Sequence, residues 1–225
     1  ASFAGSPRWY HALYLDALAL PTAFHLPDLF VTVTFNPDWP ELSRMMPAHA
    51  DVHDHPDVVA RVFWMRFSRI MKDIVVHKVF GAVLSYCFRI EWQMRGFPHA
   101  HLLLILERRI SSAADVDRFV AAEIPDPTTH PELHQLVLQF QIHGPCNHGA
   151  PCVVNGFCEK GFPKQLQSCT VMMSNAYPLY MRRGLVSAQV RGQTVNDAWV
   201  VPYNPWLLAR HRSHINCEVA SHLIL

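Results

Sequence analysis

The chain has 225 residues and a mass of 25.7 kDa; half of its residues are apolar and 16% are charged. This composition is typical of a folded globular protein and excludes extensive disorder. No apolar run reaches the roughly 18 residues that a membrane-spanning helix needs, so we expect no membrane contact. The length suits one large domain, and we interpret residues 1–225 as a single domain that ends before its natural C-terminus.

Charge is unevenly distributed along the chain. The formal net charge of +1 offers no general attraction to nucleic acid. Residues 1–132 carry 12 Lys and Arg against 15 Asp and Glu, whereas residues 133–225 carry 7 against 3. Any site for a polyanion is therefore expected in a local basic patch of the C-terminal part.

The first third of the chain alternates helical and extended patterns. A serine and a proline can begin a helix over residues 6–24. The β-branched and aromatic residues 29–35 predict a strand, which Asn36-Pro37 ends. A polar loop over residues 49–56 then leads into a long helix that Asp57 can cap.

Two apolar runs follow, at residues 79–90 and 99–106, and the turn residues 93–96 join them. We interpret them as an antiparallel pair. Short helices are predicted over residues 115–122 and 131–142. These elements favour the α+β class, with a central antiparallel sheet and helices packed on it.

The C-terminal part is less regular. Residues 143–163 are rich in Gly, Pro and Cys and suggest a zinc-knuckle-like insertion within the domain. In the tail, 171–225, Gly192 separates two candidate short strands, and residues 200–202 resemble a sheet edge.

A His-x-His pattern at His99 and His101 falls on one of the apolar strands. Residues two apart on a strand face the same side, so both imidazoles can bind one divalent ion. Glu91, on the opposite arm of the predicted hairpin, can add a carboxylate, which suits Mg²⁺, Mn²⁺ or Zn²⁺. With 15 histidines one such pattern is expected by chance, and a second, His53-Asp54-His55, lies in a polar loop. The alternative is a pair of core histidines hydrogen-bonded to the backbone.

The insertion contains three evenly spaced cysteines with histidines nearby. Three thiolates and one imidazole satisfy tetrahedral zinc. We expect a structural zinc site, with His143 preferred over His148 as the fourth ligand; the alternative is three reduced thiols in a loop. The proposed ligands are His143, Cys146, Cys152 and Cys158.

Basic residues of the C-terminal part are interleaved with aromatic ones. Phosphate contacts and stacking surfaces together are what a single-strand binder uses, whereas a solvated surface is the plainer alternative for each residue. The candidate DNA contacts are Lys160, Lys164, Arg182, Arg183, Arg210 and Arg212.

Several motifs, in order along nearly the whole chain, resemble the Rep, or helitron helicase-like, domain of Helitron transposases. The residues 93–101, Gln-Met-Arg-Gly-Phe-Pro-His-Ala-His, resemble its HUH motif. The other matching segments are residues 5–8, 27–40, 143–146, 162–164, 201–205 and 214–218.

The resemblance implies an HUH endonuclease that nicks single-stranded DNA and stays joined to the 5′ end through a phosphotyrosine. It implies Mg²⁺ or Mn²⁺ on His99 and His101, and we choose Glu91 as third ligand with Gln93 in reserve. It also implies a nuclear location and a helicase domain in the parent protein.

The tyrosine nucleophile departs from the family pattern. In the family it follows the segment that corresponds to residues 214–218, and no tyrosine follows here. The spacing of Tyr177 and Tyr180 resembles that of a pair of nucleophilic tyrosines on a helix, but Pro178 argues against a helix between them. We assign no catalytic tyrosine and expect it beyond residue 225. The alternatives are an inactive single-stranded-DNA-binding transposon remnant and, less favoured, a zinc hydrolase with Glu91 as base.

Overall fold

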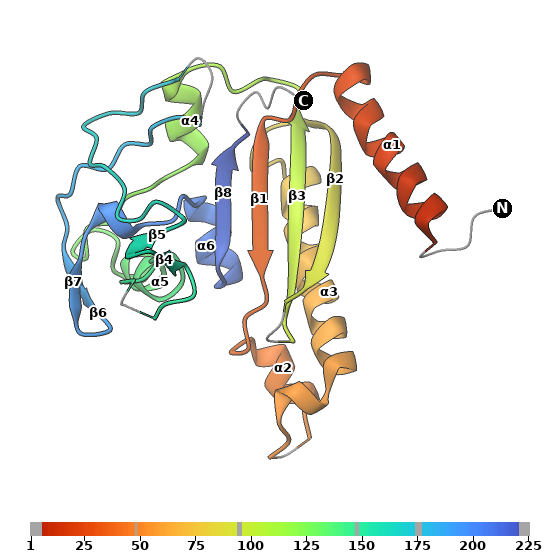
Figure 1. The fold of residues 1–225 in the computed structure, drawn as a ribbon, viewed down its shortest axis with the longest axis horizontal. Helices are drawn as coiled ribbons and strands as arrows, with labels where there is room; N and C mark the ends of the chain where they lie inside the picture. The colour runs from red at the N-terminus through yellow and green to blue at the C-terminus, as the bar shows by residue number, and fades with distance from the viewer. Residues whose placement is uncertain (1–5, 48, 94–95, 147–148, 174–176, 221–225) are drawn as a thin grey trace.

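The computed structural model describes residues 6–47, 49–93, 96–146, 149–173 and 177–220. Four strands form the central antiparallel sheet, in the order β2-β3-β1-β8 (Figure 1). Their bounds are β1 Leu29–Thr34, β2 Val83–Trp92, β3 Pro98–Leu106 and β8 Ile215–Val219. The α+β class and the central antiparallel sheet predicted from the sequence are confirmed.

The sheet has one buried face and one half-exposed face. On β1, Leu29, Val31 and Val33 are fully buried, and the residues between them are half-exposed. β3 and β8 show the same alternation, because successive side chains of a strand point to opposite faces. Burial of these apolar side chains supplies the main stabilisation of the sheet, at about 25 cal/mol per Å².

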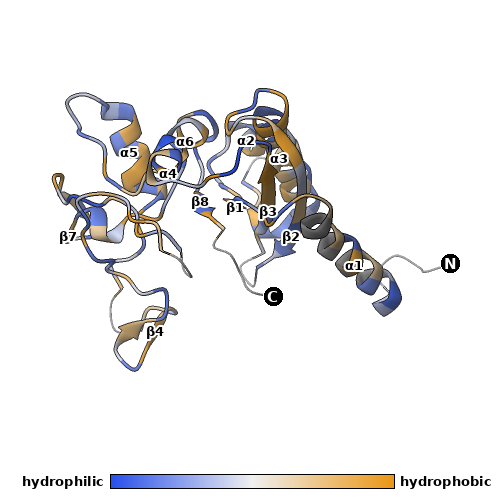
Figure 2. Ribbon diagram, turned by 90° about the horizontal axis from the view of Figure 1, so that it is seen from above, coloured by the Kyte–Doolittle hydropathy of each residue, from blue (hydrophilic) through white to orange (hydrophobic). Residues whose placement is uncertain are grey.

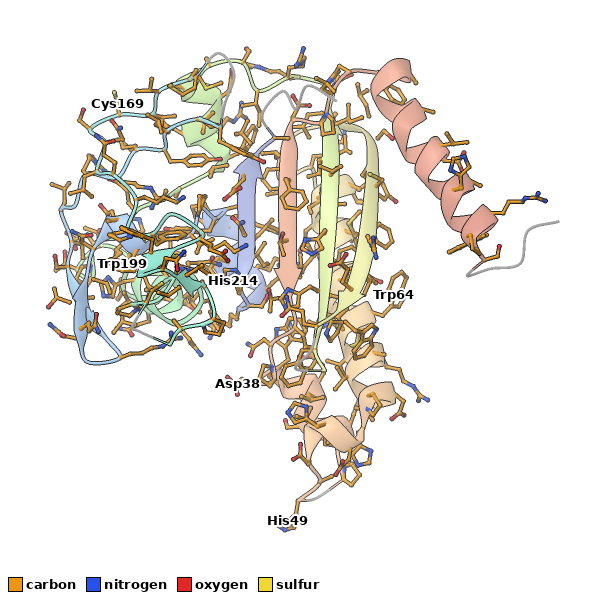
Figure 3. The ribbon with its side chains drawn as sticks, viewed as in Figure 1. Asp38, His49, Trp64, Cys169, Trp199 and His214 are labelled. Carbon is orange, nitrogen blue, oxygen red and sulfur yellow. The ribbon has the colours of Figure 1, made fainter. Side chains whose placement is uncertain are left out.

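The helix α3 (Pro56–Val75) packs on the buried face, and the short α2 (Pro40–Met45) lies beside its beginning (Figure 2). Apolar side chains of α3 at helical spacing, from Val59 to Ile74, enter the core as predicted. α1 (Pro7–Ala23) lies to the side of β2 (Figure 1). None of the described helices combines the length and the apolar character needed to cross a bilayer.

The remaining elements form a second body beside β8, around a smaller apolar core (Figure 2). We call residues 141–204 the C-terminal region. Its helices are α5 Pro131–Phe140 and α6 Pro205–His211, whereas the nearby α4 Ala113–Phe119 packs through Val116 on the main core. Its hairpins pair β4 Val153–Val154 with β5 Phe157–Cys158 and β6 Ala188–Val190 with β7 Gln193–Val195.

Several predicted boundaries were wrong. β2 begins at Val83, because residues 79–82 form the turn that leaves α3. Residues 200–202 form no strand; Val200 makes only an isolated bridge with Ile142. The short helices α2 and α6 were not predicted, since each is too short to show a helical period, although Pro40 and Pro205 mark their first turns.

Candidate metal centres and the surrounding surface

His99 and His101 project from the half-exposed face of β3. His99 lies opposite Thr34 on β1 and Glu91 on β2, and His101 lies opposite Thr32 on β1. The residue between the two histidines is buried on the other face. Both imidazoles therefore lie on one side of the sheet, as the spacing predicted.

Neighbouring strands hold both rings through the same nitrogen. The Oγ1 atom of Thr32 lies 3.1 Å from Nδ1 of His101, and that of Thr34 lies 3.5 Å from Nδ1 of His99. Nε2 of Gln93 is a further 3.2 Å contact to Nδ1 of His99. Contacts at Nδ1 orient an imidazole and leave its Nε2 available to a ligand.

The Glu91 carboxylate lies beside His101. Its Oε2 is 3.5 Å from Nε2 of His101, and its Oε1 is 3.2 Å from Nε of Arg89. The side chain of Glu91 is 44% exposed, so a cation can approach its carboxylate from solvent. Glu91 contacts one of the two histidines, and Gln93 contacts the other.

The charge state of His99 suits a metal ligand. Burial, together with the neighbouring His214 and His101, lowers the pKa of His99 to about 4, and Glu91 opposes this shift. The imidazole is therefore neutral near pH 7, and a neutral ring has the free electron pair that a divalent ion needs. Neutral imidazoles and a carboxylate are ligand types that Mg²⁺, Mn²⁺ and Zn²⁺ accept.

The second centre is the Cys and His cluster of the C-terminal region. The ligand atoms of His143, Cys146, Cys152 and Cys158 all lie within 4.8 Å of one another. Nε2 of His143 is 3.2 Å from Sγ of Cys158, and the Sγ atoms of Cys146 and Cys152 are 3.4 Å apart. This Cys₃His cluster could bind a structural zinc ion. Across the described residues it is the one group of three or more such side chains drawn this close together; His99, His101 and Glu91 are not.

The β4–β5 hairpin brings two of these cysteines together. Asn155 and Gly156 take positive φ angles of 52° and 82°, which a tight two-residue turn requires. Val153 consequently pairs with Cys158, which places Cys152 beside it. His148, the alternative fourth ligand, lies outside the described residues.

The cysteines of this cluster interact strongly with one another. Burial, together with hydrogen bonds to Cys152 and Cys158, raises the pKa of Cys146 to about 12. Cys146 is therefore protonated near pH 7 unless a cation stabilises its thiolate. Metal binding must release this proton, because only the thiolate is a zinc ligand.

Two lysines lie next to the Cys₃His cluster and are exposed. The ring of Phe162 stacks on His143 with 4.3 Å between centroids. Nζ of Lys164 lies 4.9 Å from the centre of the Phe162 ring and donates to the carbonyl of Lys160 at 2.8 Å. The exposed ammonium groups of Lys160 and Lys164 are available to an anion.

The four arginines predicted to contact DNA all have partners within the chain. Arg182 is 3% exposed and donates to the carbonyls of Asp197 and Val200 at 2.6 and 2.7 Å. Arg183 donates to both carboxylate oxygens of Glu123. Ion pairs also join Arg210 to Asp73 and Arg212 to Glu132. Their role as DNA contacts stays a prediction, but the guanidinium of Arg182 is buried against backbone carbonyls and does not face solvent.

A cavity of about 600 Å³ lies between β8 and residues 160–182. Tyr177 lines it and is 48% exposed. Tyr180 is buried, and its hydroxyl accepts from the N–H of Val219 at 2.9 Å. Sequence reasoning missed this cavity; the only signal was the alternation of polar and apolar residues over 214–218, which predicts the face that β8 presents.

The comparisons bear on the N-terminal half. Residues 1–104 match the family model described as the Helitron helicase-like domain at the N-terminus. The match extends from α1 into β3 and includes both His99 and His101. A search of curated proteins gives no match. Over residues 1–104, this match confirms the resemblance to the Helitron helicase-like family that the motifs indicated.

Proposed function

We propose that this chain is the HUH endonuclease domain of a Helitron-like protein, which nicks and joins single-stranded DNA during rolling-circle transposition. The observation that carries the proposal is the pair of imidazoles on one open sheet face, each held through Nδ1, beside Glu91. The pair lies within the part of the chain that matches the Helitron-like family.

In this proposal His99, His101 and Glu91 hold a Mg²⁺ or Mn²⁺ ion. When bound, the ion supplies a Lewis acid that polarises the scissile phosphate and offsets the charge that develops there. Thr32 and Thr34 would orient the two rings through Nδ1 and leave both Nε2 atoms available to the ion. Gln93 is the alternative to Glu91 as third ligand; if it does not bind the ion, it positions His99 through the contact at Nδ1.

The single strand would be guided by Lys160 and Lys164, whose exposed ammonium groups suit phosphate contacts. We leave Arg182 out of this interface because its guanidinium is buried. A tyrosine attacks the phosphate in this mechanism: its hydroxyl oxygen forms the new ester, the bond from phosphorus to the 3′-oxygen breaks, and the hydroxyl proton ends on that oxygen as a free 3′-OH. We place that tyrosine beyond residue 225, and we extend the proposal to a helicase domain in the parent protein and a nuclear location.

The test is metal binding followed by covalent capture. Titration with Mn²⁺, followed by electron paramagnetic resonance, is expected to show a site that the His99→Ala/His101→Ala variant loses. The matched control is His53→Ala/His55→Ala, which removes the other His-x-His pair and is expected to retain the site. A longer chain that extends past residue 225, incubated with labelled single strands and Mn²⁺, is expected to give a protein–DNA adduct on a denaturing gel.

Two outcomes would contradict the proposal in different ways. Equal Mn²⁺ binding by the double variant and the unmodified chain would remove His99 and His101 from the site. Single-strand binding that survives this substitution, with no adduct under any metal, would favour a DNA-binding transposon remnant instead.

A further inference from the structure

The cavity beside β8 has two walls of different chemistry. One wall consists of alternate residues of the sheet edge, His214, Asn216 and Glu218. The other comes from residues 160–182 and carries Lys160, Lys164 and Tyr177. Its volume of about 600 Å³ lies in the range of pockets that enclose small organic ligands.

The sheet wall offers hydrogen-bond acceptors that lack partners. Oδ1 of Asn216 is buried, and no described residue donates to it. The carboxylate of Glu218 is half-buried and makes no hydrogen bond or ion pair with the described residues. Burial lowers the pKa of the nearby Arg182, and the charge of Glu218 is among the groups that oppose this shift. An unpartnered buried acceptor is costly, so this wall is suited to a ligand that carries N–H donors.

The opposite wall suits the other parts of a nucleotide. Tyr177 is 48% exposed and presents an aromatic ring on which a base can stack. Lys160 and Lys164 are exposed beside it and can contact a phosphate. Phe162 is less available, because its ring already contacts His143 and the Lys164 ammonium.

The cavity lies close to the proposed metal centre. Thr32 pairs with Asn216 on one side and with His101 on the other. Asn216 and His101 are therefore two strands apart on the same sheet face, or about 10 Å. That separation is short enough for a single DNA strand to reach both places.

We propose that the cavity binds one unstacked nucleotide of the single strand and selects a base with adjacent hydrogen-bond donors, guanine above all. The N1–H and N2 amino groups of guanine can donate together to a carboxylate such as Glu218, whereas thymine offers one N–H. Protein recognition of single strands commonly uses such splayed bases. This inference rests on the proposed function, since it specifies the base that the DNA-binding surface selects.

The test compares three labelled single strands at one fixed salt concentration by fluorescence anisotropy. The first contains only thymine, the second contains guanine among the thymines, and the third replaces guanine with hypoxanthine, which lacks the N2 amino group. The guanine strand is expected to bind at least about tenfold more tightly than the thymine strand, with hypoxanthine between them. Glu218→Gln is expected to remove most of this preference, measured as the ratio of the two affinities.

Two further variants keep the result interpretable. Glu107→Gln makes the same charge change at an exposed position outside the cavity and is expected to preserve the preference. Tyr177→Ala, at a ring that is 48% exposed, is expected to weaken binding of the guanine strand. Equal affinity of the unmodified chain for all three strands, or a preference that Glu218→Gln leaves intact, overturns the base pocket while DNA binding stands. Failure to bind any strand overturns the proposed function as well.

Discussion

The central sheet and the C-terminal region are stabilised in different ways. The sheet consists of strands of five to ten residues whose inner face packs against α3 through buried apolar side chains. The C-terminal region has strands of two or three residues and shares a smaller apolar core with α5 and α6. It also encloses charged and polar side chains, among them Arg182, Asp197 and Asn204.

These buried side chains form hydrogen bonds with backbone groups that paired strands would satisfy in a larger sheet. The Asp197 carboxylate accepts from the N–H groups of Ile124 and Gly184 at 2.7 and 2.6 Å. The Arg182 guanidinium donates to carbonyls of the same segment. The stability of the sheet therefore depends on buried apolar area, and such a core tolerates substitutions that conserve its volume. The stability of the C-terminal region depends on individual buried hydrogen bonds, so the loss of one donor or acceptor is costly.

The largest expected effect comes from removing the metal of the Cys₃His cluster. We expect about one zinc ion per chain, measured by atomic absorption. Cys158→Ser is expected to abolish zinc binding and to lower Tm by more than about 10 °C, because structural zinc contributes folding energy directly. In hydrogen exchange, amides of residues 141–204 should lose protection while those of β1 and β3 keep it.

The matched control is Cys169→Ser, which removes an exposed cysteine outside the cluster. It should retain the zinc and the Tm of the unmodified chain. A zinc-free protein with full protection in residues 141–204 would show that the cysteines pack as ordinary thiols and that polar contacts alone hold the region.

A smaller effect is expected from Arg182→Met, which keeps the approximate length of the side chain and removes the guanidinium. The carbonyls of Asp197 and Val200 then lose a charged donor inside the protein. We expect a loss of about 3–5 kcal/mol in the free energy of unfolding, measured by urea denaturation. Arg183→Met, at the exposed neighbour that pairs with Glu123, should cost no more than about 1 kcal/mol. Equal effects of the two substitutions would remove the distinction between buried and surface arginines.

This contrast also explains what the sequence could predict. The periodicity of apolar residues and the turn residues predict three parts of the sheet domain, because their apolar side chains face one core: strand β1, helix α3 and the hairpin of β2 and β3. The facing of His99 and His101 follows from strand alternation alone. The buried position of Arg182 cannot be predicted in this way, because a basic residue among aromatic residues gives the same sequence pattern whether it binds phosphate or backbone carbonyls. Pairing of β8 with β1 is likewise a long-range contact that local pattern cannot reveal.

The same limit applies to the junction between the two bodies, where α3 meets α6. Asp73 on α3 lies 2.9 Å from Nε2 of His211 and 2.8 Å from Nε of Arg210. Burial, opposed by Asp73, lowers the pKa of His211 to about 4. Burial of Asp73 would raise its own pKa, but hydrogen bonds from His77 and Arg210 keep that pKa below its ordinary value. Between pH 4 and 6.5 the junction therefore holds a neutral imidazole beside an ionised carboxylate.

The last and smallest effect is the acid sensitivity of this junction. The unfolded chain binds a proton at His211 below its ordinary pKa of 6.5, whereas the folded chain binds it only near pH 4. Stability is therefore complete above pH 6.5 and falls as the pH drops towards 4, by at most about 3 kcal/mol for this residue. Burial lowers the pKa of His99, His143 and His214 as well, and these histidines add to the slope of stability against pH.

His211→Gln should reduce the slope of the free energy of unfolding, measured in urea, against pH in this window, whereas the exposed His130→Gln should leave it unchanged. An unaltered slope in His211→Gln would mean that the two bodies separate before His211 takes up its proton.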